Sequence, residues 1–400
     1  MKILVVGGGS GGHITPAIAV VRKILEIRPR TRVEFFTDRK YYRNVTKISV
    51  ENGLNFSVKK IFSGKFHRYS GWGIKDYFEH LDLTIKDLII GNLVGFFGFL
   101  GGLVQSFFLL LNKRERPDVI FLKGGYVGLP VGIVAKMFRI SYVIHESDSV
   151  PGLANRILMK GAKVVAMGVS YEKTEQIPNN WEWVGIPIAE EFKKVSEGKK
   201  RELKKIFGFA EGKPLVVVTG GSQGSENLDR ATKEILPELL KIVSVGLVAG
   251  RKHYEEMIEL KKFEKWEGSK LMSDFRMWEF NTAMHELLGA ADIVVSRAGA
   301  TTIAELAALG KTVILVPFAA LPGAHQVKNA ERLVKKNAVV LVDDAKMYED
   351  SNVLLQVISK LVKKPEKMDE LASNLHSEVK TGAAKRLAEI LIEIGDHEKK

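Results

Sequence analysis

The chain has 400 residues, which is too long for one ordinary domain and predicts two or three. Its 46% hydrophobic and 27% charged residues are typical of a globular protein with a large core. The lack of cysteine excludes disulfides, thiol catalysis and thiolate metal sites. A net charge of +13 favours an anionic partner, either acidic lipid, a phosphorylated substrate or nucleic acid. No recognition-helix pattern, RNP-like motif or long basic tail indicates nucleic acid.

The first predicted element is a buried strand, the apolar run Ile3–Val6, which ends in the loop GGGSGGH at residues 7–13. Glycine lets the backbone approach a ligand closely, and the N-terminus of a helix attracts anions. We expect that helix to start near Ile14, with Pro16 in its first turn. The pattern predicts a loop that binds phosphate or sugar, and His13 adds a side chain capable of acid–base chemistry.

The same loop fits a second class of enzyme. Gly7, Gly9 and Gly12 match G-x-G-x-x-G, and Asp38 follows the next predicted strand, Val33–Thr37. This spacing is compatible with an NAD-dependent oxidoreductase in which Asp38 binds a ribose. The start MKILVVGGG is not a signal peptide, so we expect the catalytic body to stay in the cytoplasm.

Short apolar strands alternate with helical stretches in two series, which predicts an α/β protein with two doubly wound parallel sheets. A lysine- and glutamate-rich linker, Glu190–Pro214, separates the series, and a second glycine loop follows at residues 220–224. Two such domains facing each other across a cleft would bind ligands at the carboxyl ends of their strands. The predicted strands are Ile3–Val6, Val33–Thr37, Val119–Leu122, Tyr142–His145 and Val164–Met167, then Leu215–Thr219, Val245–Ala249, Ile293–Ser296, Val313–Val316 and Val339–Val342.

The segment Leu88–Leu111 carries no charge over 24 residues and is long enough to span a bilayer. A crossing would separate strands that must share one sheet, so we expect an element embedded in the membrane surface. The alternatives are an apolar core helix and a non-enzymatic protein that binds membrane surfaces. The residues expected to touch lipid are Leu88, Ile89, Ile90, Phe96, Phe97, Phe99, Phe107 and Phe108. Flanking cations suited to anionic headgroups are Lys59, Lys60, Lys65, Arg68, Lys113, Arg114 and Arg116.

A third loop, at residues 296–305, follows the predicted strand Ile293–Ser296 and opens another helix. Its N-terminus suits a diphosphate, with Thr301 and Thr302 as additional donors. Glu305 is expected to accept hydrogen bonds from sugar hydroxyls, although a glutamate that caps the helix would look the same in sequence.

Together these segments resemble the MurG family of glycosyltransferases. The stretches that carry the resemblance are GGGSGGHITPAIAV, LKGGYVGLPVG, VIHESDSVPGLANR, VGIPI, GGSQGSENL, AADIVVSRAGATTIAELAALGK and PFAALPGAHQVKNA. The resemblance implies the GT-B fold: an acceptor- and membrane-binding Rossmann-like domain at residues 1–187, a UDP-GlcNAc-binding one at 188–378, and a closing helix at 379–400 that packs back on the first.

The resemblance also implies the reaction, which is transfer of GlcNAc from UDP-GlcNAc to the 4-hydroxyl of the lipid I muramyl sugar, with inversion, in peptidoglycan synthesis. No metal or other cofactor is implied, and the site is expected at the cytoplasmic face of an anionic membrane. Asp148 and Ala189 depart from the family pattern, where asparagine and arginine are usual, and leave open a related enzyme with another lipid-linked acceptor.

The site residues follow by the same resemblance. His13 matches the favoured general base, with a purely acceptor-positioning role as the alternative. Acceptor-binding positions are Gly124, Gly125, Tyr126, His145 and Glu146. Donor-binding positions are Ser10, Gly11, Gly12, Asp148, Gly221, Ser222, Asn281, Ala300, Thr301, Glu305 and Gln326.

Overall fold

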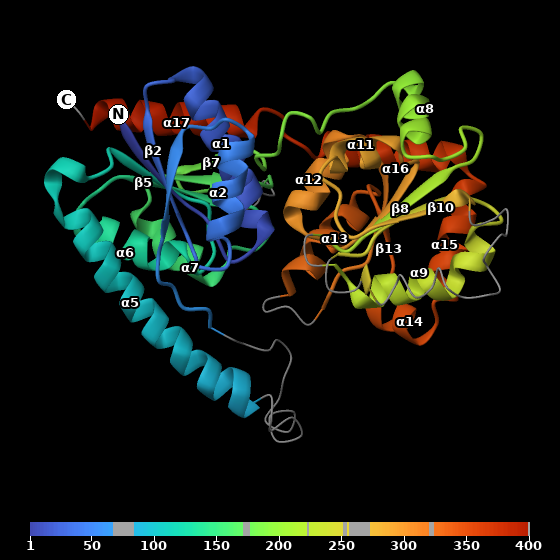
Figure 1. The fold of residues 1–400 in the computed structure, drawn as a ribbon, viewed down its shortest axis with the longest axis horizontal. Coiled ribbons are helices and arrows are strands. Elements are labelled where there is room, and N and C mark those ends of the chain that lie inside the picture. The colour runs from blue at the N-terminus through green and yellow to red at the C-terminus, as the bar shows by residue number, and fades with distance from the viewer. Residues whose placement is uncertain are drawn as a thin grey trace. The chain divides into compact units, whose positions relative to one another are not determined.

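The computed structural model describes residues 1–66, 84–170, 177–221, 224–250, 254–255, 273–319 and 324–398. The chain forms two compact units (Figure 1). Unit 1 comprises Met1–Ala189, Ala320–His325 and Lys380–Lys400, and unit 2 comprises Glu190–Ala319 and Gln326–Val379. Each unit contains a parallel sheet with helices on both faces, so the predicted pair of Rossmann-like domains is confirmed.

In the described part of unit 1, seven parallel strands run in the order β3-β2-β1-β4-β5-β6-β7. The order reverses between β1 and β4, which is where doubly wound sheets open toward a ligand. The strands are β1 (Lys2–Val6), β2 (Arg32–Thr37), β3 (Phe56–Lys60), β4 (Val119–Leu122), β5 (Tyr142–Glu146), β6 (Val164–Met167) and β7 (Trp181–Trp183). The helices are α1 (Gly11–Ile27), α2 (Tyr42–Glu51), α5 (Asn92–Leu111), α6 (Gly128–Met137), α7 (Leu153–Leu158) and α17 (Ala383–His397), with a π-helix, η1 (Thr84–Gly91), and two short 3₁₀ helices, η2 (Lys113–Glu115) and η3 (Met159–Gly161).

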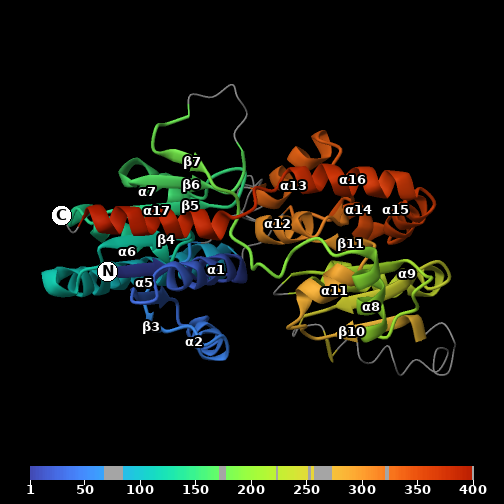
Figure 2. The same ribbon diagram turned by 90° about the horizontal axis from the view of Figure 1, so that it is seen from above.

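The two faces of this sheet are both buried, because successive side chains of a strand point to opposite sides. Ile3 and Val5 of β1 pack with α1 and α17, whereas Leu4 and Val6 pack with α6 and its neighbours. Helix α17 lies along α1 although it ends the chain (Figure 2). The two helices are joined by Arg28, whose Nη1 lies 2.6 and 2.7 Å from the carboxylate oxygens of Asp396.

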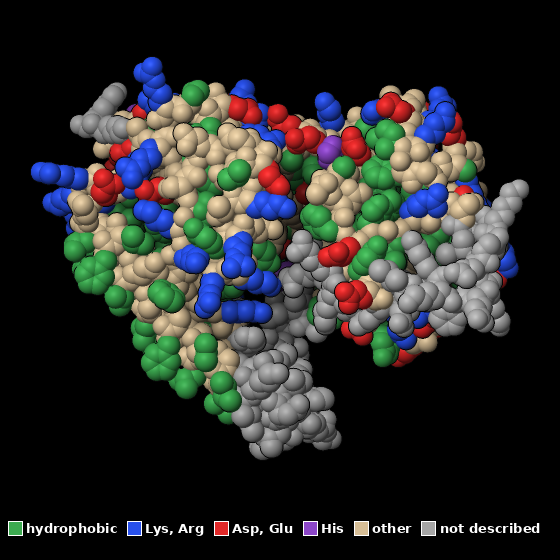
Figure 3. Space-filling model, viewed as in Figure 1, with side chains coloured by type: hydrophobic (Ala, Val, Ile, Leu, Met, Phe, Trp, Pro, Cys, Tyr) green, Lys and Arg blue, Asp and Glu red, His purple; other side chains and the backbone are tan. Residues whose placement is uncertain are grey.

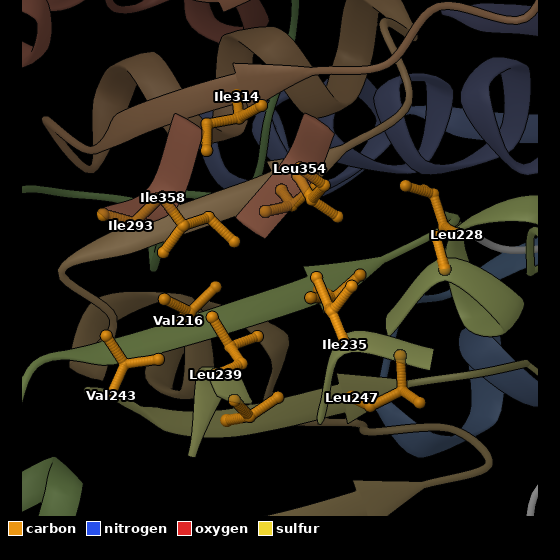
Figure 4. Close-up of a cluster of buried hydrophobic side chains, with 14 of the residues drawn as sticks. Val216, Leu228, Ile235, Leu239, Val243, Leu247, Ile293, Ile314, Leu354 and Ile358 are labelled. Atoms are coloured by element: carbon orange, nitrogen blue, oxygen red, sulfur yellow. The ribbon is translucent and has the colours of Figure 1, made fainter. Parts of the chain in front are cut away.

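Unit 2 repeats the plan, with the described strands in the order β10-β9-β8-β11-β12-β13, all parallel. They are β8 (Leu215–Thr219), β9 (Ser244–Val248), β10 (Phe275–Trp278), β11 (Ile293–Ser296), β12 (Thr312–Leu315) and β13 (Val340–Leu341). The helices are α8 (Glu197–Ile206), α9 (Glu226–Leu239), α11 (Met284–Ala290), α12 (Ala300–Ala308), α13 (His325–Lys335), α14 (Asp344–Glu349), α15 (Asn352–Val362) and α16 (Pro365–Ser377). Figure 4 shows one half of the core, where Val216 and Ile293 of the sheet meet Leu239 of α9 and Ile358 of α15.

The sequence missed three strands, β3, β7 and β10. Each lies at an edge of its sheet, where one side of the strand has no neighbour. Two of them carry alternating or polar side chains, FSVKK in β3 and FRMW in β10, in place of a continuous apolar run. An apolar run marks only strands that are buried on both faces, so it cannot find these edges.

The segment Leu88–Leu111 forms one continuous helix, η1 followed by α5, which by length and composition could cross a membrane. Only 22% of its most apolar window is buried in the protein, which speaks against an ordinary core helix. Three glycines, Gly95, Gly98 and Gly102, let its backbone lie against the backbone of residues 62–65, since a Cβ there would come within 2.5, 2.7 and 2.2 Å of carbonyl oxygens. The helix is therefore attached to unit 1 through a glycine face.

Candidate active site

The predicted site residues of unit 1 follow β1, β4 and β5. Because these strands are parallel neighbours, the loops after them leave the same edge of the sheet. The loop after β1 carries Ser10 and leads into α1 at Gly11. The prediction that this helix starts near Ile14 with Pro16 in its first turn is wrong: Ser10 has extended backbone angles and is the N-cap, so Gly11 and Gly12 begin the first turn and Pro16 lies beyond it, inside the helix.

His13 is thus the third residue of α1. Its Nδ1 lies 2.9 Å from Ser10 Oγ, and its ring lies against Gly125, where a Cβ would be 3.2 Å from Cε1. Gly125 has φ +76, a conformation that suits glycine. When Nδ1–H donates to Ser10, Nε2 is left unprotonated and can accept a proton.

The surroundings of His13 determine its charge state. Burial is the largest cause of a pKa lowered to about 4, with Lys123 adding to it and Asp148 opposing it. The helix N-terminus acts in the same direction, because it disfavours a cation. The ring is therefore neutral at pH 7 in the free protein.

Lys123 was not among the predicted site residues. It lies directly after β4 and is 1% exposed, and its Nζ donates to Ser147 Oγ at 2.8 Å. Burial lowers its pKa to about 8, against the opposing charges of Glu146 and Asp148. The sequence signal was a lysine at the end of the wholly apolar strand VIFL, which places an ammonium group at the carboxyl edge of the sheet.

His145 and Glu146, predicted to border an acceptor, are turned into the protein. His145 is fully buried, its Nε2 lies 2.8 Å from the carbonyl oxygen of Gly185, and burial holds its pKa well below the usual range. The Glu146 carboxylate accepts the backbone N–H groups of Asp148 and Gly152 at 3.0 and 2.9 Å. Asn155 also donates to it, at 2.8 Å. In this structure both residues shape the loop after β5.

Asp38 lies at the carboxyl end of β2 and is buried. Its Oδ2 accepts the backbone N–H of Gly9 at 2.6 Å, so the carboxylate is occupied inside the protein. The N–H of Gly7 is also occupied, by the carbonyl oxygen of Phe36 at 3.1 Å. A loop with these two amides occupied and a carboxylate beneath it is poorly suited to a phosphate, which weakens the dinucleotide alternative.

In unit 2, the described donor-site positions also follow the carboxyl ends of parallel strands. Gly221 follows β8 with φ +79, Asn281 follows β10, Ala300 and Thr301 follow β11, and Gln326 follows β12. Asn281 Oδ1 accepts the N–H of Ala283 at 2.8 Å, and Gln326 Oε1 accepts that of Phe318 at 2.9 Å. Ser222 lies outside the described residues. The other predicted donor positions, Ser10, Gly11, Gly12 and Asp148, belong to unit 1.

The N-terminus of helix α12 is suited to an anion. Its N-cap, Gly299, provides no side-chain hydrogen bond, and its first turn contains no acidic residue. Such an N-terminus presents the positive end of the helix dipole, which favours an anion. The alternative that Glu305 caps this helix is wrong, because Glu305 lies beyond the first turn.

Glu305 is the most perturbed carboxyl group of unit 2. Its carboxyl group makes no hydrogen bond to any residue within the described ranges, and burial raises its pKa to about 8. A half-buried carboxyl group without a partner is costly to ionise, and hydroxyl donors from a ligand would relieve that cost.

A polar clamp ties the start of α9 to the start of α12. Arg297 donates from Nε to Ser225 Oγ at 2.9 Å and from Nη1 to the carbonyl oxygen of Val316 at 3.0 Å. Its Nη1 also lies 2.6 Å from Asp344 Oδ1, and Asn227 donates to the other oxygen of that carboxylate at 3.0 Å. Arg297 therefore positions the loops after β8 and β11.

The apolar surface of α5 forms a second feature of unit 1. Five of the eight predicted lipid contacts are exposed: Ile89, Ile90, Phe96, Phe97 and Phe108. Figure 3 shows apolar side chains along α5, with Lys and Arg side chains gathered beside them. Leu88, Phe99 and Phe107 are half-buried, and the ring of Phe107 packs 5.3 Å from that of Phe138 at the border of the core. The sequence missed other exposed members: Phe62, Phe66, Leu93, Val94, Leu100, Val104 and Leu111.

Comparison with known proteins places the chain in a family. The glycosyltransferase family 28 N-terminal domain matches residues 3–167, and the C-terminal domain of the same family matches residues 215–387. A UDP-N-acetylglucosamine–N-acetylmuramyl-(pentapeptide) pyrophosphoryl-undecaprenol N-acetylglucosamine transferase from Bacillus pumilus is 33% identical, with 98% of this chain and 99% of the relative covered. The chain belongs to the MurG family of glycosyltransferases.

Other comparisons agree. A relative of the same name from Carboxydothermus hydrogenoformans is 28% identical over 98% of this chain and 97% of its own length. The crystal structure of MurG from Acinetobacter baumannii has the same fold, with a TM-score of 0.68 at 21% identity, covering 98% of this chain and 99% of that one. As a MurG-family member the chain is a glycosyltransferase, and the oxidoreductase and non-enzymatic alternatives are wrong. In the described ranges, no group of three His, Asp or Glu side chains could hold a metal ion.

Proposed function

We propose that this chain transfers GlcNAc from UDP-GlcNAc to the 4-hydroxyl of the muramyl sugar of lipid I, giving lipid II and UDP. The relatives' names support the substrates. The observation that carries the donor assignment is the start of α12, an uncapped N-terminus without an acid in its first turn, followed by Glu305 with its unpartnered carboxyl group. A diphosphate suits the former, and ribose hydroxyls suit the latter.

The donor half of the reaction is stabilisation of a leaving group. The bond between the anomeric carbon of GlcNAc and the UDP oxygen breaks, and negative charge develops on the diphosphate. The N–H groups at the start of α12 are dipoles held by the helix, and they favour this charge without rearrangement. The Arg297 clamp supports this role by fixing the loops after β8 and β11.

The acceptor half needs a proton acceptor. The 4-hydroxyl oxygen attacks the anomeric carbon from the side opposite UDP, which inverts the configuration, and its proton goes to the unprotonated nitrogen of His13. The pKa of about 4 keeps this nitrogen free at pH 7, while making it a weak base. The arrival of an anionic diphosphate would raise that pKa, as any nearby negative charge does.

We also propose that unit 1 docks on the cytoplasmic face of an anionic membrane through α5. Exposed apolar side chains such as Phe97, 63% exposed, and Phe108, 66% exposed, support insertion below the headgroups. The exposed Lys59 and Lys60 on the edge strand β3 support attraction to anionic lipid. A protein held there would meet a lipid-linked acceptor at the surface where that lipid lies.

The test is transfer of labelled GlcNAc to lipid I in vesicles that contain phosphatidylglycerol, with UDP-GalNAc and UDP-glucose as competing donors and undecaprenyl phosphate-linked sugars as competing acceptors. The proposal predicts that lipid II forms from UDP-GlcNAc and lipid I, and that the competing donors and acceptors do not react. Transfer to another lipid-linked acceptor in preference to lipid I would overturn the acceptor assignment, and preference for another sugar would overturn the donor.

A further inference from the structure

Asp38 contacts three segments that leave the carboxyl edge of the unit 1 sheet. Its Oδ2 accepts the N–H of Gly9, after β1, at 2.6 Å, and its Oδ1 accepts the N–H of Tyr41, before α2, at 3.0 Å. The hydroxyl of Tyr126, after β4, lies 3.4 Å from Oδ2. One buried carboxylate thus joins the loops that follow β1, β2 and β4.

Two of these loops hold His13. Gly9 directly precedes Ser10, whose hydroxyl contacts the His13 ring, and Tyr126 directly follows Gly125, whose backbone packs on that ring. The Tyr126 ring also lies against Gly9, where a Cβ would be only 2.7 Å from Cε1. A change at Asp38 is therefore transmitted to both sides of His13 through short, direct contacts.

We propose that Asp38 is a positioning residue that holds the two glycine loops around His13 and so sets the rate of the acceptor step without touching substrate. The inference rests on the proposed function for the reaction it affects. A carboxylate suits the task because a charge-assisted hydrogen bond to an N–H is about twice as strong as a neutral one. Asp38 also raises the pKa of Tyr126, which burial and this charge bring to about 12, so the hydroxyl remains a donor.

The test variant is Asp38→Asn. The amide keeps the size of the side chain but has only one acceptor oxygen, so either Gly9 or Tyr41 meets an N–H donor in place of an oxygen. The matched control is Asp118→Asn, because Asp118 Oδ2 accepts the N–H of Lys2 at the same 2.6 Å, at the opposite end of β1. Both variants lose a carboxylate–backbone bond, but only the first loosens the loops around His13.

We expect Asp38→Asn to lower kcat/KM for the lipid acceptor by about 10- to 100-fold, the range that small misplacement of a reacting group produces. The dissociation constant of UDP is expected to stay the same, since the two features proposed to hold UDP, the start of α12 and Glu305, lie in unit 2. Asp118→Asn is expected to lower the melting temperature as much as Asp38→Asn does. Its activity is nevertheless expected to stay within about twofold of wild type, because the bond that it changes serves only stability. Equal activities of the two variants per folded molecule would overturn the proposal.

A second readout needs no turnover. The imidazole signals of His13 in a ¹H–¹⁵N spectrum, assigned by their loss in His13→Gln, are expected to move in Asp38→Asn and to stay in place in Asp118→Asn. Unchanged His13 signals in Asp38→Asn would contradict the proposal. If the wild-type protein transfers sugar to no lipid-linked acceptor, the proposed function fails, while this spectrum still decides whether Asp38 positions His13.

Discussion

Each unit contains a strand followed by a loop and a helix, but the charged groups around the two loops differ. In unit 1 the N–H of Gly9 at the first loop is occupied by the Asp38 carboxylate, and the helix that follows carries a neutral histidine in its first turn. In unit 2 the N-terminus of α12 has no side-chain cap and no acid in its first turn, and Glu305 has a pKa of about 8. A phosphate would be repelled by the first arrangement and attracted by the second.

The comparison shows that a glycine loop does not by itself indicate what binds there. What distinguishes the loops is a small number of charges, the buried Asp38 and Lys123 in unit 1 and the partly buried Arg297–Asp344 pair in unit 2. Each of these residues fixes the geometry of a loop, but the electrostatic environment that a ligand would meet differs between the two units. Four changes, taken from the largest expected effect to the smallest, test the division into a chemical loop and a binding loop.

Replacing His13 by Gln is the most damaging change. The amide has similar size but cannot accept a proton at this pH, so transfer is expected to fall by about 100- to 10,000-fold, the range for loss of a general base. The measurement is lipid II formation under saturating substrates, with the melting temperature as a control for folding. Turnover within a few-fold of wild type would leave His13 with a purely positioning role.

The pH dependence of UDP binding tests Glu305. Its pKa is raised to about 8 in the free protein, and hydroxyl donors from the ribose would lower it, so binding releases a proton. The affinity is therefore expected to rise with pH, by at most about tenfold per unit, and to level off above about pH 8. Calorimetry in buffers of different ionisation enthalpy measures the proton release directly. The matched variant Glu305→Gln is expected to bind more weakly, with a flat profile; a wild-type profile that is already flat would contradict this assignment.

The clamp in unit 2 is probed by Asp344→Asn. Arg297 and Asp344 are each 12% exposed, so this change leaves a nearly buried guanidinium without its charge partner and loosens the loops after β8 and β11. We expect UDP to bind about tenfold more weakly, equal to about 1.4 kcal/mol, while the signals of His13 in unit 1 stay unchanged. The control is Asp343→Asn, one residue earlier, which removes a carboxylate that accepts the exposed N–H of Lys346 and does not contact Arg297 in the described part of the chain. Equal UDP affinity in the two variants would exclude the clamp from donor binding.

The last expected effect, no larger than that of Asp344→Asn, concerns the membrane surface. Phe97→Ser removes an exposed ring from α5, so binding to phosphatidylglycerol vesicles is expected to fall by about tenfold, as the lost apolar area of one aromatic side chain implies. Activity on a water-soluble acceptor analogue is expected to remain. Val50→Ser, on the exposed surface of α2, is the control. Equal vesicle binding by both variants would show that α5 is not the surface that binds the membrane.

Much of the fold was predictable because its central strands are buried on both faces. Runs such as VIFL and LVVVT leave little choice but a parallel sheet between helices, and their bounds matched β4 and β8. Edge strands and the true start of α1 were missed, because polar alternation and a glycine-rich first turn carry no such signal. The direction of side chains could not be predicted from the sequence either. Nothing in the residues HES, at positions 145–147, shows that His145 is turned toward Gly185.

The charges around the site were the least predictable feature. His13 and Glu305 have ordinary pKa values in an unfolded chain, and only their surroundings in the folded units move those values to about 4 and about 8. Asp38 was visible as a ribose-binding candidate, yet its partners, Gly9 and Tyr126, come from two other loops. Their contact depends on strand order, which no local pattern shows.

The central claim is that the donor binds on the loops of unit 2 while His13 of unit 1 serves the chemistry. The most direct test is the dissociation constant of UDP at pH 8.5, about half a unit above the pKa of Glu305, measured by calorimetry for the wild type, His13→Gln and Glu305→Gln. We predict equal affinity for the wild type and His13→Gln, and about tenfold or greater loss for Glu305→Gln, as expected when a hydrogen bond to a charged group is removed. Loss of UDP binding in His13→Gln together with wild-type affinity in Glu305→Gln would contradict the account.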